Sequence, residues 1–164
     1  MAAMPAVTIA VIGPGDPGVD PRLLQIAETV GAQLAAAQAT VVCGGLGGVM
    51  EAAARGAAQA GGTVIGLLPG PDRSAANPWI THAIPTGLGE ARNVLIARAA
   101  DAVVAVGGAY GTLSEIAMAL KLGRAVIGIE TWEMRRDAAV DAGIVPAPNP
   151  TEAVRLALAA ARPH

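Results

Sequence analysis

Short apolar runs alternate along the chain with longer segments whose apolar residues recur every three or four positions. The short runs are rich in valine and isoleucine, which is typical of strands buried on both faces. The longer segments have the spacing of amphipathic helices. Strands that alternate with helices predict one α/β domain over 1–164, with a Rossmann-like, doubly wound, mainly parallel sheet flanked by helices. We expect the strands at 7–12, 40–43, 63–68, 79–84, 101–106, 125–130 and 144–145.

Capping residues mark two of the helix starts. Asp20 precedes Pro21, and Asn149 precedes Pro150, so each pair suits an N-cap and the first helical position. Residues 69–78 form a loop because three prolines interrupt them. Residues 131–143 have an ambiguous pattern, for which we expect a short helix.

Three glycine-rich turns, at 13–18, 44–48 and 107–111, follow predicted strands. The carboxyl ends of parallel strands share one edge of the sheet, and ligands bind at that edge. Turn 107–111 leads into a helix whose first amides lack partners within the helix, so a phosphate there gains hydrogen bonds and a favourable dipole. We place Glu115 in the first turn of this helix, where its carboxylate can accept hydrogen bonds from sugar hydroxyls. A purely structural turn explains the same glycines equally well.

The composition excludes several classes of partner. The formal net charge of −2 and the single tyrosine, two tryptophans and absence of phenylalanine argue against a nucleic-acid surface. We expect no membrane span, because no apolar run is long enough. The lone Cys43 fits a reducing compartment, so we expect a cytoplasmic protein. Charged residues make up 15%, against roughly 25% in soluble domains, which favours a homo-oligomer, most simply a homodimer.

Few side chains are available for chemistry. One cysteine and one internal histidine, His82, leave too few ligands for a zinc site and argue against nucleophilic triads, so we expect neither a metal nor a cofactor. Turn 44–48 is no dinucleotide fingerprint, because Met50 stands where the third glycine belongs. Arg92 and Arg98 lie six positions apart on a predicted helix, so one can face the ligand site while the other pairs with a carboxylate such as Asp101.

Three motifs together resemble the LOG family, once mislabelled as lysine decarboxylases. They are Gly-Glu-Ala-Arg-Asn at 89–93, Ala-Arg-Ala-Ala-Asp-Ala at 97–102 and Gly-Gly-Ala-Tyr-Gly-Thr-Leu-Ser-Glu at 107–115. The resemblance covers residues 7–130 and implies a phosphate-bearing ligand, since the family includes cytokinin riboside 5′-monophosphate phosphoribohydrolases. The chain departs from those enzymes in having Gly-Gly-Ala for Pro-Gly-Gly at 107–109 and Asn93 for a lysine. It looks more like a sister branch near the molybdenum cofactor carrier proteins, which bind a phosphorylated pterin.

The resemblance implies a site built from the glycine turns and the polar residues beside them. It assigns Arg92 and Glu115 to catalysis. The residues expected to bind a nucleoside monophosphate or a pterin-type ligand are Gly13, Gly44, Gly45, Gly47, Arg92, Asn93, Gly107, Gly108, Tyr110, Gly111, Thr112 and Glu115.

Three functions stay open at this point. An enzyme would hydrolyse the N-glycosidic bond of a nucleoside 5′-monophosphate to base and ribose 5-phosphate. A non-catalytic carrier or sensor would bind molybdenum cofactor or a nucleotide in the same pocket. An interaction protein would use the turns for structure alone.

Overall fold

A seven-stranded sheet forms the centre of the molecule in the computed structural model, which describes residues 6–161. The strand order is β4-β3-β2-β1-β5-β6-β9, and every neighbouring pair is parallel. This confirms the predicted fold class. The strands are β1 (Thr8–Ile12), β2 (Thr40–Cys43), β3 (Val64–Leu68), β4 (His82–Pro85), β5 (Ala102–Val106), β6 (Ala125–Ile129) and β9 (Ile144–Pro146).

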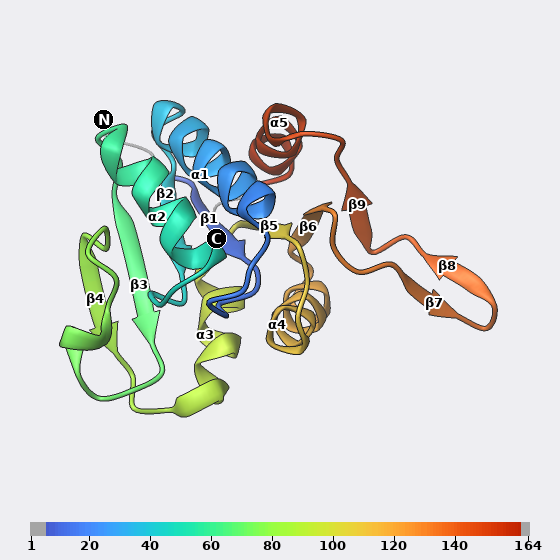
Figure 1. Ribbon diagram of the computed structural model, residues 1–164. Helices are drawn as coiled ribbons and strands as arrows, with labels where there is room; N and C mark the ends of the chain where they lie inside the picture. Colours follow the sequence, from blue (N-terminus) through green and yellow to red (C-terminus); the bar gives the residue numbers. More distant parts are fainter. Residues whose placement is uncertain (1–5, 162–164) are drawn as a thin grey trace, which may run out of the picture.

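Helices cover both faces of this sheet, as Figure 1 shows. On one face lie α1 (Pro21–Ala36), α2 (Val49–Gln59) and α5 (Pro150–Ala160), and on the other lie α3 (Asn93–Ala99) and α4 (Tyr110–Lys121). Each face therefore has its own apolar core, and the central strand β5 is buried along its whole length. Two 3₁₀ turns, η1 (Arg73–Ala75) and η2 (Gly89–Arg92), lie in the connections. No helix within residues 6–161 combines the length and apolarity needed to cross a membrane.

Two glycines bring α1 and α2 into backbone contact. A Cβ atom at Gly31 would lie 2.0 Å from the carbonyl oxygen of Ala53, and one at Gly56 would lie 1.9 Å from that of Glu28. No real Cβ fits at these distances, so both positions require glycine. The helices pack closely because the side chains between them are so small.

The predicted caps are confirmed. The side chain of Asp20 accepts a hydrogen bond from the Arg22 amide at 2.8 Å, and that of Asn149 accepts one from the Glu152 amide at 2.9 Å. Each cap satisfies an amide that has no partner inside its helix.

Three helices end in the same way, with a residue in the left-handed region. After α2 and α4 this residue is glycine, Gly61 (φ 78°) and Gly123 (φ 74°), whereas after α1 it is Gln38 (φ 61°). The Ala39 amide then donates to the Leu34 carbonyl at 3.0 Å, as in a Schellman motif. Gln38 holds this conformation at a cost that glycine avoids.

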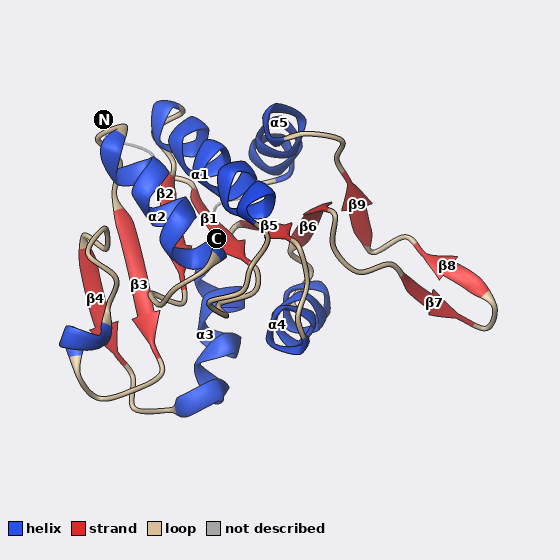
Figure 2. Cartoon of the chain, viewed as in Figure 1, coloured by secondary structure: helices blue, strands red, loops and turns tan. Residues whose placement is uncertain are grey.

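The prediction of a short helix within 131–143 is wrong. This segment forms a hairpin of β7 (Met134–Arg136) and β8 (Ala139–Asp141), a second, antiparallel sheet that projects from the body (Figure 2). Both turn residues, Asp137 (φ 50°) and Ala138 (φ 64°), are left-handed, which no right-handed helix can contain.

The strand expected at 79–84 begins later, at His82. The side chain of Asn77 accepts a hydrogen bond from the Trp79 amide at 3.1 Å, and this local turn occupies the first residues of the predicted strand.

Candidate functional site

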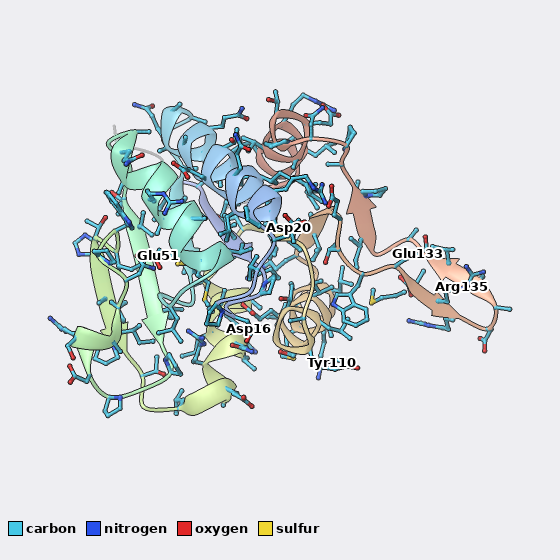
Figure 3. The ribbon with its side chains drawn as sticks, in the orientation of Figure 1. Asp16, Asp20, Glu51, Tyr110, Glu133 and Arg135 are labelled. Atoms are coloured by element: carbon cyan, nitrogen blue, oxygen red, sulfur yellow. The ribbon has the colours of Figure 1, made fainter. Side chains whose placement is uncertain are left out.

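A cavity of about 710 Å³ lies at the carboxyl edge of the sheet, where the loops after β1, β2 and β5 meet. Figure 3 labels two of its lining residues, Asp16 on the loop after β1 and Tyr110 at the start of α4. Segments of all three glycine turns thus contribute to one cavity, at the edge where the sequence places the site. The lining residues are Gly13, Pro14, Gly15, Asp16, Leu46, Met50, Pro69, Glu90, Arg92, Asn93, Ala109, Tyr110, Gly111, Thr112, Ser114 and Glu115.

The structure brings part of the predicted site set to the cavity wall. The predicted residues that line it are Gly13, Arg92, Asn93, Tyr110, Gly111, Thr112 and Glu115. The predicted glycines that do not line it are Gly44, Gly45, Gly47, Gly107 and Gly108.

These remaining glycines allow close packing behind the cavity wall. A Cβ at Gly44 would lie 2.7 Å from Nη1 of Arg92, and one at Gly108 would lie 2.8 Å from Nε1 of Trp132. The Gly107 amide donates to the carbonyl of Ile129 at 3.0 Å. A Cβ at Gly44, Gly45, Gly107 or Gly108 would lie less than 3.0 Å from protein atoms, so a side chain there would disturb the fold first. At Gly47 it would meet only the Gly15 carbonyl oxygen, at 3.4 Å.

Arg92 is a buried charged residue of the site, only 8% exposed. Its Nη1 donates to the carbonyl oxygens of Gly44 and Leu67, which lie at the ends of β2 and β3. Its Nε donates to Oδ1 of Asn93 at 3.1 Å. Burial lowers the pKa of Arg92 from its usual value, and the charge of Glu115 opposes that shift. Nη2 has no hydrogen-bond partner among the described residues, so two donors are free beside the cavity.

Asn93 connects Arg92 to the start of α4. Its Nδ2 donates to Oγ of Ser114 at 3.1 Å, and that hydroxyl donates to the Gly111 carbonyl at 2.7 Å. Asn93 therefore orients the guanidinium and joins α3 to α4.

The N-terminus of α4 presents unpaired donors to the same cavity. Its N-cap residue, Ala109, offers no side-chain cap, and the first helical hydrogen bond runs from the Leu113 amide to Ala109. The amides of Tyr110, Gly111 and Thr112 accordingly have no partner within the helix. The hydroxyl of Thr112, a residue only 2% exposed, also lacks a partner among the described residues.

Glu115 lies in the second turn of α4, not the first as expected, because the helix already starts at Tyr110. Burial raises the pKa of its carboxyl to about 7, and the positive charge of Arg92 opposes this shift. Within residues 6–161 its carboxylate forms no ion pair, so Arg92 acts on it from a distance. A cavity group with a pKa near neutrality can hold or release a proton under physiological conditions.

The prediction that one of the two arginines pairs with Asp101 is wrong. Asp101 accepts a hydrogen bond from the Thr8 amide at 2.8 Å and forms no ion pair with Arg98 among the described residues. Its carboxylate thereby fixes the start of β1 beside β5, while Arg98 is exposed.

Comparison with known proteins identifies the family. The sequence profile described as the SLOG cluster4 family matches residues 6–154. This chain belongs to the SLOG cluster4 family. A relative of the chain, an uncharacterised protein from Archaeoglobus fulgidus, is 43% identical over 127 residues, which are 77% of this chain and 82% of the relative.

Two solved structures are similar over nearly their full length. The molybdenum cofactor binding protein from Rippkaea orientalis is 32% identical with a TM-score of 0.85, and 96% of this chain and 98% of that chain are covered. The molybdenum cofactor carrier protein from Chlamydomonas reinhardtii is 33% identical with a TM-score of 0.82, with 94% and 98% covered. These findings confirm the resemblance to the LOG family near the molybdenum cofactor carriers.

Sequence reasoning missed several lining residues of this SLOG cluster4 protein. Asp16 and Ser114 lie within segments that the motifs already covered, so their position beside the chosen residues was an available signal. Glu90 likewise lies in the motif at 89–93, two residues before Arg92. Pro69 comes from the connection after β3, and nothing in the local pattern indicates that this connection reaches the cavity.

Cys43 lies at the end of β2, fully buried, and burial raises the pKa of its thiol to about 11. A thiol with this pKa is a poor nucleophile at neutral pH. In the part of this SLOG cluster4 protein that the structure describes, no group of three or more His, Cys, Asp and Glu side chains is arranged to hold a metal ion.

Proposed function

We propose that this protein is a non-catalytic carrier of a phosphorylated pterin-type ligand, of which molybdenum cofactor is the example that its relatives suggest. Two similar proteins, matched over nearly their entire length, are described as binding or carrying that cofactor. The ligand would occupy the cavity at the carboxyl edge of the sheet.

The observation that carries this proposal is the set of unpaired donors around the start of α4. The Thr112 hydroxyl is buried without a partner, the adjacent amides are free, and Nη2 of Arg92 offers two further donors. A buried polar group without a partner costs free energy, which a bound acceptor recovers. A phosphate supplies several acceptor oxygens and is favoured by the helix dipole.

The remaining lining charges favour a ligand with donors elsewhere. Asp16, Glu90 and Glu115 are also on the cavity wall, so Arg92 is outnumbered by carboxyl groups. A ligand with phosphate at one end and amino or hydroxyl groups at the other suits such a wall. A pterin phosphate has this division, because its ring carries N–H donors.

The test adds a side chain where the cavity has room for one. A Cβ at Gly111 meets nothing within 4 Å, and the same is true at Gly18, which does not line the cavity. We expect Gly111→Val to weaken binding of molybdenum cofactor, released anaerobically from a molybdenum enzyme, at least tenfold, whereas Gly18→Val binds as wild type does. Binding is read from pterin fluorescence after oxidation of the retained ligand. Unchanged affinity in a folded Gly111→Val protein would exclude this position for the phosphate.

Hydrolysis of a nucleoside 5′-monophosphate is the second candidate. The observation that favours it is that the half-buried Glu115 and Arg92 line the same cavity. With the 5′-phosphate at the start of α4, the carboxylate would hold the ribose hydroxyls and stabilise positive charge on the ribose as the bond to the base breaks. Arg92 would orient the substrate.

Release of free base from a panel of nucleoside monophosphates tests this candidate. If the protein is an enzyme, Glu115→Gln keeps the shape of the side chain but removes its charge, and kcat falls by about 10²-fold or more while KM changes little. Absence of base release by wild type from every nucleotide leaves the carrier function. Equal release by both proteins would show that Glu115 is not catalytic.

We further propose that the protein works in the cytoplasm as a homodimer. The low charged fraction supports an oligomer, and the lone buried thiol suits a reducing compartment. Light scattering of the purified protein gives the mass, and cell fractionation gives the compartment.

A further inference from the structure

The hairpin of β7 and β8 has no support from the main sheet. Its strands have three residues each, they pair only with one another, and the hairpin projects from the α/β body (Figure 1). An isolated two-stranded hairpin is marginally stable in water. Its turn adds a further cost, because Ala138 occupies the left-handed region without the freedom of glycine. The hairpin therefore has open edges at which a further strand can pair and stabilise it.

The surface beside the hairpin has both exposed apolar side chains and a cavity. Val140, at the centre of β8, is 52% exposed, and Val145 on β9 is 40% exposed. Both line a cavity of about 510 Å³ between the hairpin and the edge of the main sheet, together with Trp132, Met134 and Ile144. Three acidic residues, Glu130, Glu133 and Asp141, also line this mainly apolar cavity, and each is ion-paired with an arginine of the same chain. An exposed apolar side chain and an apolar recess on the same surface are what a two-fold interface requires, since one patch must complement itself.

We propose that two copies of this chain join by antiparallel pairing of their β8 strands around a two-fold axis at Val140. The two hairpins then form one four-stranded sheet, and the apolar cavities beside them are covered. This inference rests on the proposed homodimer and is independent of the ligand.

The charges of the hairpin select β8 over β7 as the paired edge. A two-fold axis at the middle of β7 would place Arg135 opposite its own copy, and like charges opposite each other are destabilising. An axis at the middle of β8 places Val140 opposite Val140 and Asp141 opposite Ala139, so no like charges meet. Figure 3 labels Arg135 on β7 and Glu133 just before it, which form an exposed ion pair. Asp141, the one charged residue of β8, is already paired with Arg136 of the same hairpin at 3.2 Å.

The first experiment measures the mass of wild type and two variants by light scattering at micromolar concentration. Val140→Asp places two carboxylates against each other across the axis, and we expect it to halve the mass of the particle. The matched control is Ile84→Asp, which is 46% exposed on β4 at the opposite edge of the sheet, and we expect it to keep the wild-type mass. Far-UV circular dichroism verifies that both variants are folded.

The second experiment uses a new thiol in place of Val140. Because Cys43 is buried, Val140→Cys introduces the accessible thiol, and oxidation should link two chains into a covalent dimer. Ile84→Cys is the control that should stay monomeric on a non-reducing gel. A monomeric wild type would refute the homodimer itself. An oligomer that persists in Val140→Asp, or that only Ile84→Asp dissociates, would refute this surface and leave the homodimer standing.

Discussion

Replacement of Arg92 by methionine measures how much the guanidinium stabilises the fold, apart from any ligand. Methionine keeps an unbranched stem but removes the donors that satisfy the carbonyl oxygens of Gly44 and Leu67. A buried acceptor that loses its partner costs about 1–3 kcal/mol, so two would cost about 2–6 kcal/mol. The cavity lets water approach one side, and loss of a buried cation offsets part of the cost. We therefore expect about 2–3 kcal/mol, a decrease in Tm of roughly 4–12 °C for a chain of this length.

Urea unfolding of the ligand-free protein is the assay, and a constant m value would show that both proteins unfold from comparable states. Arg98→Met is the matched control, since Arg98 lies in α3, directly after the 3₁₀ turn that contains Arg92, but is exposed. Its free energy of unfolding should stay within about 0.5 kcal/mol of wild type. If Arg92→Met is equally neutral, then the two carbonyl contacts do not stabilise the strand ends.

Three further predictions concern stability. The pKa of Glu115 is raised from 4.5 to about 7, so between pH 4.5 and 7 the folded state keeps a proton that the unfolded state has released. The free energy of unfolding of wild type should therefore fall by up to about 3 kcal/mol as the pH rises from 4.5 to 7. Urea denaturation of Glu115→Gln at pH 4.5 and pH 7 should not show this decrease. An equal decrease in wild type and Glu115→Gln would contradict the prediction. Gln38→Gly should raise the free energy of unfolding by about 1 kcal/mol, because it relieves a left-handed residue, and no gain in urea would disprove the strain. Gly56→Ala should lower Tm, since its methyl group would overlap the Glu28 carbonyl oxygen, and an unchanged Tm would show that α1 and α2 can separate freely.

Local pattern was sufficient for the main sheet and for the capped helices. The valine-rich runs are buried strands, and Asp20 and Asn149 satisfy amides as their type suggests. The hairpin was missed because its turn is Asp137-Ala138, which lacks the glycine or asparagine that usually marks such a turn. The start of α4 was misplaced because Ala109, its N-cap, has no side-chain oxygen to signal the boundary.

The cavity was predictable in position but only partly in composition. Parallel strands bring their carboxyl ends together, so the three glycine turns had to meet at one edge. Which glycines face the ligand and which pack against protein depends on contacts far apart in sequence, such as Gly108 with Trp132. The hydrogen bonds from Arg92 to two strand ends likewise depend on tertiary structure, because Leu67 and Gly44 lie 25 and 48 residues away in the sequence.

The tight contact between α1 and α2 bears on how much conformational entropy the chain would lose on binding a ligand. The turns that precede α1 and α2 are also held against each other. The Val49 amide donates a hydrogen bond to the Pro14 carbonyl at 3.0 Å, and Gly48 packs against that carbonyl. Backbone that is already fixed loses little conformational entropy when a ligand arrives. One wall of the cavity is therefore preorganised, and the free energy of binding the proposed ligand there would go into affinity instead of into ordering the loops.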